Sequence, residues 1–362
     1  MKWIARAFLM LLISVAMAAT TAWGALAIYY SDLPGEGLRQ VLAFAFALFG
    51  AALLGWYLFS AKRIRPLLTF LAAFLLLVAW WSTIRPSQNR DWAPEYAKPA
   101  HATVNGDLVT IHNIRNFDYR TETDFTPGYY TKTFDLRQLD SVDLIASYWM
   151  GDAIAHTIMS FGFSGKDFLA VSIETRRERQ ENYSSIAGFF KQYELFYVVA
   201  DERDLIRLRT NYRKDPPEDV YLYRTVAPAA NARRVFLDYI REINSLTGKP
   251  EFYNTLTTNC TTSILTHTRV NPGHVPLSWK VLLSGYVPQY LYERRRIDTS
   301  LPFAELKQRS HINAAAQAAN RAPDFSQRIR AGLPTPPKLD RLAHRAPPEE
   351  RVSAVAGRGL VP

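Results

Sequence analysis

Three long stretches without a charged residue place the strongest constraint on what this chain can fold into. They cover residues 7–30, 40–61 and 66–84. Each can cross a bilayer as a helix, which takes about 20 apolar residues. The first stretch is rich in small side chains over residues 14–25, so cleavage as a signal peptide is an alternative for it. The other two would still hold the chain in a membrane, and a lipid bilayer is therefore the first expected partner.

Basic residues in the short loops predict the orientation of these spans. Lys2 and Arg6 precede the first span, and residues 62–65 between the second and third spans contain three more basic side chains. The loop at residues 31–38 has two acidic residues and no basic one. Because Lys and Arg favour the cytoplasmic side, the chain after residue 84 is expected outside the membrane. In a bacterium this describes a multi-pass inner-membrane protein with its soluble part in the periplasm.

The remainder of the chain divides into three parts by composition. Residues 85–100 contain three prolines and are expected to form a linker. Residues 101–300 are long enough for one domain with a substantial core. Residues 301–362 are rich in Ala, Arg and Pro, which predicts a largely extended or disordered C-terminal extension.

The hydrophobic pattern of the central part predicts an α+β domain in which strands come first and helices follow. Residues 147–163 and 168–175 are rich in β-forming side chains, and the glycines between them favour a hairpin. Two further strands are expected at residues 193–199 and 220–225. Apolar residues at helical spacing then predict a helix over residues 229–246.

Charge and motif content argue against several classes of function. The formal charge is +10, but the C-terminal extension alone has ten Lys and Arg against five Asp and Glu after Pro302, and no nucleic-acid-binding motif accompanies it. We therefore expect no nucleic-acid partner. There is also no metal-ligand spacing, phosphate loop or dinucleotide fingerprint, so no metal and no cofactor are expected. The charged run at residues 201–204 is interpreted as a solvated face.

The single cysteine, Cys260, is the leading candidate for chemistry. It lies in a polar run at residues 257–262, ahead of an apolar stretch that predicts a helix to about His267. Such a run caps a helix and leaves the cysteine in its first turn, where free backbone N–H groups and the helix dipole stabilise a thiolate. The same N–H groups suit a developing oxyanion. The alternative is an inert, buried cysteine.

His156 is the candidate base for this thiol. It lies in the first strand of the expected hairpin, whose turn is centred near residues 164–165, so the position opposite it falls at residues 173–174. Glu174 or Ser172, whichever shares its face of the sheet, would then orient the imidazole. His112 is the main rival, and His267 would lie two turns along the helix from Cys260. A structural histidine within the sheet is the alternative.

Four segments of this sequence resemble the Lnb N-terminal periplasmic domain family, which is named after a lipoprotein N-acyltransferase and was formerly a domain of unknown function. They lie at residues 112–120, 155–161, 171–176 and 258–262, within a resemblance that covers about residues 100–290. It implies a permuted papain-like, NlpC/P60-related fold, in which the histidine strand precedes the cysteine helix. It also implies Cys260 as nucleophile and His156 as base. Glu174 as third member follows from the hairpin pairing and not from the family.

Three functions are compatible with these observations. The leading hypothesis is a cysteine-dependent acyltransferase that uses phospholipid and lipoprotein substrates through a thioester on Cys260. The first alternative is a cysteine peptidase or amidase that acts on cell-wall peptide, the commoner chemistry of NlpC/P60-like folds. The second alternative is a non-catalytic envelope module that binds a partner and keeps Cys260 buried.

Overall fold

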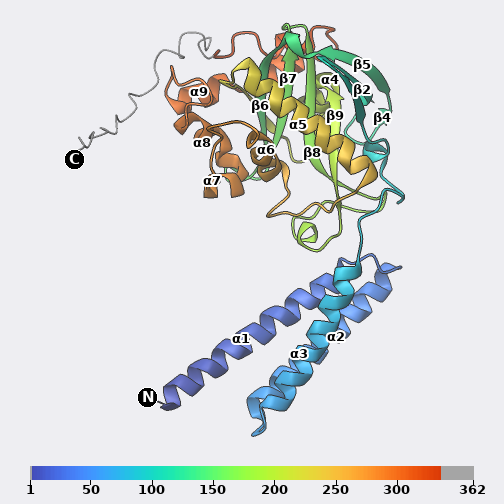
Figure 1. Ribbon diagram of the computed structural model, residues 1–362, viewed down its shortest axis with the longest axis vertical. Coiled ribbons are helices and arrows are strands. Elements are labelled where there is room, and N and C mark those ends of the chain that lie inside the picture. The colour runs from blue at the N-terminus through green and yellow to red at the C-terminus, as the bar shows by residue number, and fades with distance from the viewer. Residues whose placement is uncertain (1, 336–362) are drawn as a thin grey trace, which may run out of the picture.

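The computed structural model describes residues 2–335 and shows three long helices below an α+β domain (Figure 1). The helices are α1 (Lys2–Tyr29), α2 (Glu36–Phe59) and α3 (Ile64–Thr83), and each is long and apolar enough to cross a membrane. Their positions coincide with the three apolar stretches of the sequence. α1 and α2 approach closely, because a Cβ on Gly50 would lie 2.4 Å from the Thr21 side chain.

The domain is built on one mixed sheet with the strand order β1-β2-β9-β8-β7-β6-β10, to which β5 is added beside β2. All neighbours in it are antiparallel except β2 and β9, which are parallel. The strands are β1 (His101–Asn105), β2 (Leu108–Arg115), β5 (Tyr129–Asp135), β6 (Leu139–Tyr148), β7 (Ala155–Phe163), β8 (Asp167–Arg176), β9 (Glu194–Asp201) and β10 (Asp219–Arg224). Two short strands, β3 (Asp118–Tyr119) and β4 (Phe125–Thr126), pair separately.

Helices cover both faces of this sheet. The long helix α5 (Ala229–Gly248) crosses one face and buries Phe236, Tyr239 and Ile240 against the strands (Figure 1). The opposite face packs against α4 (Glu202–Arg207) and C-terminal residues that include Phe325 and Ile329. Because both faces are covered, the central strands β7 and β8 are almost completely buried.

A second group of helices lies beside α5 at one end of the sheet. It consists of α6 (Cys260–Thr268), α7 (Trp279–Leu282) and α8 (Val287–Glu293). The segment after α7 is tied to the start of β7, because Ser284 Oγ accepts a hydrogen bond of 2.9 Å from the Ala155 amide. Gly285 is required there, since a Cβ would lie 2.0 Å from the Asp152 carbonyl oxygen.

The expected linker, residues 85–100, packs against the domain. Trp92 is buried under the Arg176 guanidinium, which lies 4.1 Å from the centroid of the indole ring. The Arg90 Nε atom lies 2.9 Å from the buried Glu194 carboxylate. These contacts fasten the domain directly to the end of α3.

The C-terminal extension differs from the sequence expectation in its described part. Residues 303–328 contain α9 (Phe303–Arg309), α10 (Asn313–Ala318) and α11 (Phe325–Arg328). Phe325 is fully buried in the core on the α4 side of the sheet. This segment therefore belongs to the fold, and residues 336–362 of the expected extension lie outside the described residues.

Two local interpretations of the sequence are wrong. Residues 147–163 are not one strand: β6 ends at Tyr148, a turn containing Gly151 (φ 80°) follows, and β7 begins at Ala155. The charged run at residues 201–204 is not a solvated face, because Glu202 and Asp204 are completely buried. Asp204 pairs with Arg115 at 2.7 Å, and burial of a carboxylate requires such a partner.

Candidate functional site

The candidate nucleophile Cys260 is the first residue of α6. Asn259 caps this helix by accepting hydrogen bonds from the backbone N–H groups of Thr261 and Thr262, and the Thr262 hydroxyl accepts one from the Asn259 amide in return. This reciprocal capping box is the physical reason that the helix begins here. It leaves the cysteine at the positive end of the helix, as the polar run predicted.

His156 and Glu174 face each other at the same end of the sheet. His156 is the second residue of β7, and the register of the β7–β8 hairpin, in which Ile158 pairs with Ser172, brings Glu174 opposite it. His156 Nε2 lies 3.1 Å from Glu174 Oε1. The structure therefore brings together all three residues that the sequence nominated, Cys260, His156 and Glu174.

Ser172 joins the histidine to the carboxylate. Its Oγ lies 2.6 Å from His156 Nε2 and donates a hydrogen bond of 2.6 Å to Glu174 Oε1. The sequence left Ser172 and Glu174 as alternatives for orienting the imidazole, and both contact it. Because Nε2 is engaged by these two residues, the second ring nitrogen, Nδ1, is left for the thiol.

Electrostatics favour the charged forms of the thiol and the imidazole. Burial would lower the pKa of His156, but the Glu174 carboxylate outweighs it and raises the pKa to about 9. Burial would likewise raise the pKa of Cys260, but the charge of His156 and hydrogen bonds from His156 and Thr157 lower it below its ordinary value. The pKa of Glu174 is held well below its usual range, since the charge of His156 overcomes the effect of burial. The arrangement therefore suits a thiolate–imidazolium pair.

Two residues of the site, Thr157 and Arg209, were not predicted from the sequence. The Thr157 backbone amide lies beside the Cys260 thiol and helps to lower the thiol pKa. Arg209 lies 3.3 Å from Glu174 Oε1 and 3.0 Å from Glu218 Oε2, in a single π-helical turn at residues 208–212. Thr157 follows His156 directly in β7, so its place next to the candidate base could have indicated it. No local pattern connects Arg209 to Glu174.

The other histidines considered lie elsewhere. His267 is buried between Asp238, at 2.8 Å, and the Tyr197 hydroxyl, at 2.7 Å, which is a structural role at the far end of α6. His112 stacks on His101 at the outer side of the sheet. Among residues 2–335 no group of three His, Cys, Asp or Glu side chains could hold a metal ion.

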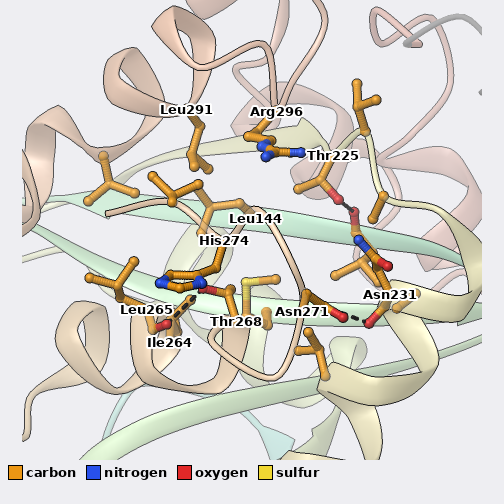
Figure 2. Close-up of a pocket in the computed structure, with 18 of the residues that line it drawn as sticks. Leu144, Thr225, Asn231, Ile264, Leu265, Thr268, Asn271, His274, Leu291 and Arg296 are labelled. Carbon is orange, nitrogen blue, oxygen red and sulfur yellow. Dashed lines mark hydrogen bonds between the residues drawn. The ribbon is translucent and has the colours of Figure 1, made fainter. Parts of the chain in front are cut away.

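An apolar cavity of about 150 Å³ adjoins α6. Figure 2 shows Ile264, Leu265 and Thr268 of α6 on one side of it, with Leu144 of β6 and Leu291 of α8 around it. Thr261, which follows the candidate nucleophile, also lines this cavity. The size is close to that of an apolar cavity that accepts a benzene molecule, so it suits several carbons of a hydrocarbon chain.

The lining of this cavity also includes polar side chains. Arg296 and His274 are seen there in Figure 2, and Arg296 donates a hydrogen bond of 2.5 Å to the Gly273 carbonyl. Within residues 2–335 Arg296 has no carboxylate within salt-bridge distance. A mainly apolar lining with one cationic side chain suits an amphipathic ligand.

The motifs around Cys260, His156 and Glu174 correspond to a known family. Residues 125–285 match the model of the Lnb N-terminal periplasmic domain family. This match contains all three site residues and confirms the family that the sequence segments resemble. The chain has no match among curated proteins and none among solved structures. Residues 125–285 therefore form an Lnb-type periplasmic domain, and the same chain has three helices that are long and apolar enough to cross a membrane.

Proposed function

We propose that this protein is a cysteine acyltransferase of the bacterial inner membrane whose Lnb-type domain faces the periplasm. The observation that carries the proposal is the Cys260 thiol at the start of α6, beside an imidazole that Glu174 keeps protonated. The order of His156 before Cys260 along the chain is that of a permuted papain-like domain, which we propose as its fold relationship. The basic residues of the loops support the orientation.

In the first half-reaction the Cys260 thiolate attacks the carbonyl carbon of a phospholipid acyl ester. The Cys260 backbone N–H, at the start of α6, is placed to stabilise the oxyanion that forms. When the ester C–O bond breaks, the His156 imidazolium gives its proton to the departing alkoxide of the lysophospholipid. The acyl group then remains on Cys260 as a thioester, with its chain in the cavity beside Thr261 and Ile264.

In the second half-reaction an amine attacks the thioester carbon. Neutral His156 accepts the proton that the amine loses, the C–S bond breaks, and the thiolate of Cys260 is restored beside the imidazolium. The product is an amide. The N-terminal amine of a lipoprotein fits this role, because it lies at the membrane surface as the donor does.

Intact-mass measurement of the detergent-solubilised protein tests the proposal. After incubation with bacterial phospholipid, the wild type should carry an acyl mass that hydroxylamine removes, while Cys260→Ser and His156→Ala should not. Asp124→Asn, at a carboxylate 57% exposed that pairs with exposed Arg120, is the matched control and should acylate normally. Absence of any adduct on the wild type, with peptide released from purified sacculi instead, would contradict acyl transfer and favour the peptidase.

A further inference from the structure

The exposed apolar side chains of the soluble domain are concentrated around the candidate site. Between residues 85 and 335, all the large exposed apolar side chains except Val104 and Leu108 lie at residues 150–154, 183–189 and 277–283 and at Leu256. We call this set the apolar rim. Large apolar side chains gathered at one end of a domain mark a binding surface, whereas scattered ones do not.

Hydrogen bonds fix these segments in two pairs on either side of the Cys260 helix. On one side, the amide of Gly285, next to α7, donates a hydrogen bond of 3.0 Å to the Ala153 carbonyl. On the other, the amide of Thr255 donates one of 3.2 Å to the Gly188 carbonyl. The start of α6 contacts both pairs, because Thr261 Oγ1 donates a hydrogen bond of 3.0 Å to the Val281 carbonyl of α7 and Asn259 Nδ2 donates one of 2.7 Å to the Thr255 carbonyl. The apolar rim therefore lies around Cys260.

The same end of the domain contacts the membrane anchor. The Phe190 ring, directly after the rim segment 183–189, stacks on Tyr30 at 5.8 Å and lies 6.2 Å from Trp23, both in α1 or next to its end. Lys191 Nζ donates hydrogen bonds to the carbonyls of Trp81, at 3.1 Å, and Ile84, at 3.3 Å, at the end of α3. The apolar rim is therefore continuous with the residues at which the chain enters the membrane.

The arrangement is visible in Figure 1, where α7 and the loop before β9 lie on the side of the domain that faces the ends of the three helices. The strand ends that carry His156 and Glu174 point the same way, because the β8–β9 connection that touches the anchor begins at residue 177, three residues after Glu174. Trp279 and Tyr183 are 57% and 52% exposed on this side. Aromatic side chains of this kind are enriched at the boundary between headgroups and acyl chains.

From this placement we propose that the apolar rim enters the outer leaflet of the membrane that holds α1–α3, so that a lipid reaches Cys260 without leaving the bilayer. The occupant of the surface is the lipid leaflet, as its continuity with the anchor indicates. The inference adds an access route to the proposed acyl transfer and rests on it for the role of Cys260. The position of the rim can be measured whether or not transfer takes place.

Because the chain has a single cysteine, a fluorophore can be attached at one chosen position after Cys260 is replaced. In a Cys260→Ser background the chain has no cysteine, so Leu282→Cys and Leu108→Cys each accept one environment-sensitive fluorophore. Both leucines are 43% exposed, but Leu108 lies in β2, outside the apolar rim, and serves as the matched control. The full chain is placed in phosphatidylethanolamine–phosphatidylglycerol nanodiscs with and without nitroxide-labelled phospholipid.

The label at residue 282 should lose fluorescence several-fold more than the label at residue 108 when the nitroxide lipid is present. Ile186→Cys, in the second pair of segments, should behave like residue 282. Equal quenching of residues 282 and 108 would overturn the inference. If the rim positions are quenched but the wild type forms no acyl adduct, the proposed transfer fails and the membrane contact stands.

A second measurement separates access from chemistry. The double variant Trp279→Glu and Leu282→Glu should slow acylation of Cys260 by bilayer phospholipid while alkylation by water-soluble iodoacetamide keeps its rate, because both side chains are exposed. Unchanged acylation in this variant would also count against the inference. A parallel loss of alkylation would show damage to the site and remove the support for an access role.

Discussion

His156 and Glu174 lie opposite each other on the β7–β8 hairpin, with Nε2 3.1 Å from Oε1 and the Ser172 hydroxyl in contact with both. The carboxylate keeps the imidazole charged, and the imidazolium in turn stabilises the thiolate of Cys260. We therefore propose that the reactivity of Cys260 depends on Glu174, which lies in β8 while His156 lies in β7.

Glu174→Gln should move the pH profile of Cys260 alkylation to higher pH. The amide removes the charge that raises the pKa of His156 to about 9, so the imidazolium is lost at lower pH and the thiol pKa rises. Loss of one nearby opposite charge corresponds to a shift of about 1 to 3 pH units. The measurement is the rate of iodoacetamide modification between pH 5 and pH 10, and the range is chosen to bracket the ordinary pKa of a thiol.

The sign of this effect distinguishes the site from a structural histidine. In the wild type, the thiolate–imidazolium pair exists from the lowered thiol pKa up to about pH 9, and acyl transfer should fall above that pH as His156 loses the proton it donates. Asp124→Asn should leave the profile unchanged. A Glu174→Gln profile identical to that of the wild type would contradict the proposed dependence.

Ser172→Ala should weaken acyl transfer without abolishing it. Ser172 is a positioning residue. The alanine variant loses the two hydrogen bonds of 2.6 Å that the Ser172 hydroxyl makes, but the direct contact between His156 and Glu174 remains. A hydrogen bond to a charged group contributes about 1.5–3 kcal/mol, which corresponds to roughly 10- to 100-fold in rate. The loss should appear in kcat with little change in KM, and Ser172→Thr should restore part of it. A change confined to KM would argue that Ser172 contacts substrate instead.

Much of the fold could be predicted from the sequence because its signals are local. The three spans are marked by the absence of charge, and the β7–β8 hairpin by apolar runs around Ser164 and Gly165. The strands β1 and β5 were missed because only Ala102 of β1 and only Phe134 of β5 are buried, so neither has a clear apolar alternation. The buried state of Asp204 depends on Arg115, 89 positions away, and no local pattern reveals such a partner.

The candidate site was predictable to the extent that hairpin geometry and helix capping determine it. Counting from the turn placed Glu174 opposite His156, and the polar run before α6 placed Cys260 in its first turn. The contact of Arg209 with Glu174 could not be anticipated, because it depends on how the π-helical turn packs against the sheet. The apolar cavity likewise arises only when α5, α6 and α8 come together.

Filling the cavity should shorten the acyl chains that Cys260 accepts. Ala232 is buried in α5 and lines the cavity, so Ala232→Phe would occupy part of its 150 Å³. Val235→Ala, one turn further along the same helix, would enlarge it and is the matched variant. With a phospholipid mixture of several chain lengths, the mass of the adduct should shift to shorter chains in Ala232→Phe and not in Val235→Ala. An identical distribution in both variants and the wild type would place the acyl chain elsewhere.

Arg330→Ala should destabilise the domain strongly, although the sequence assigns this residue to an extension. Its guanidinium lies 2.8 Å from Asp143 and 2.6 Å from Glu202, and both carboxylates are fully buried. Removing one partner of a buried ion pair leaves uncompensated charge and costs about 3–5 kcal/mol. Arg328→Ala is the matched control, because Arg328 is two positions away, is 56% exposed and pairs with exposed Asp324. This substitution should change the free energy of unfolding by no more than about 0.5 kcal/mol. Thermal unfolding of the full chain followed by tryptophan fluorescence checks both, and equal midpoints for the two variants would contradict the assignment of the C-terminal helices to the core.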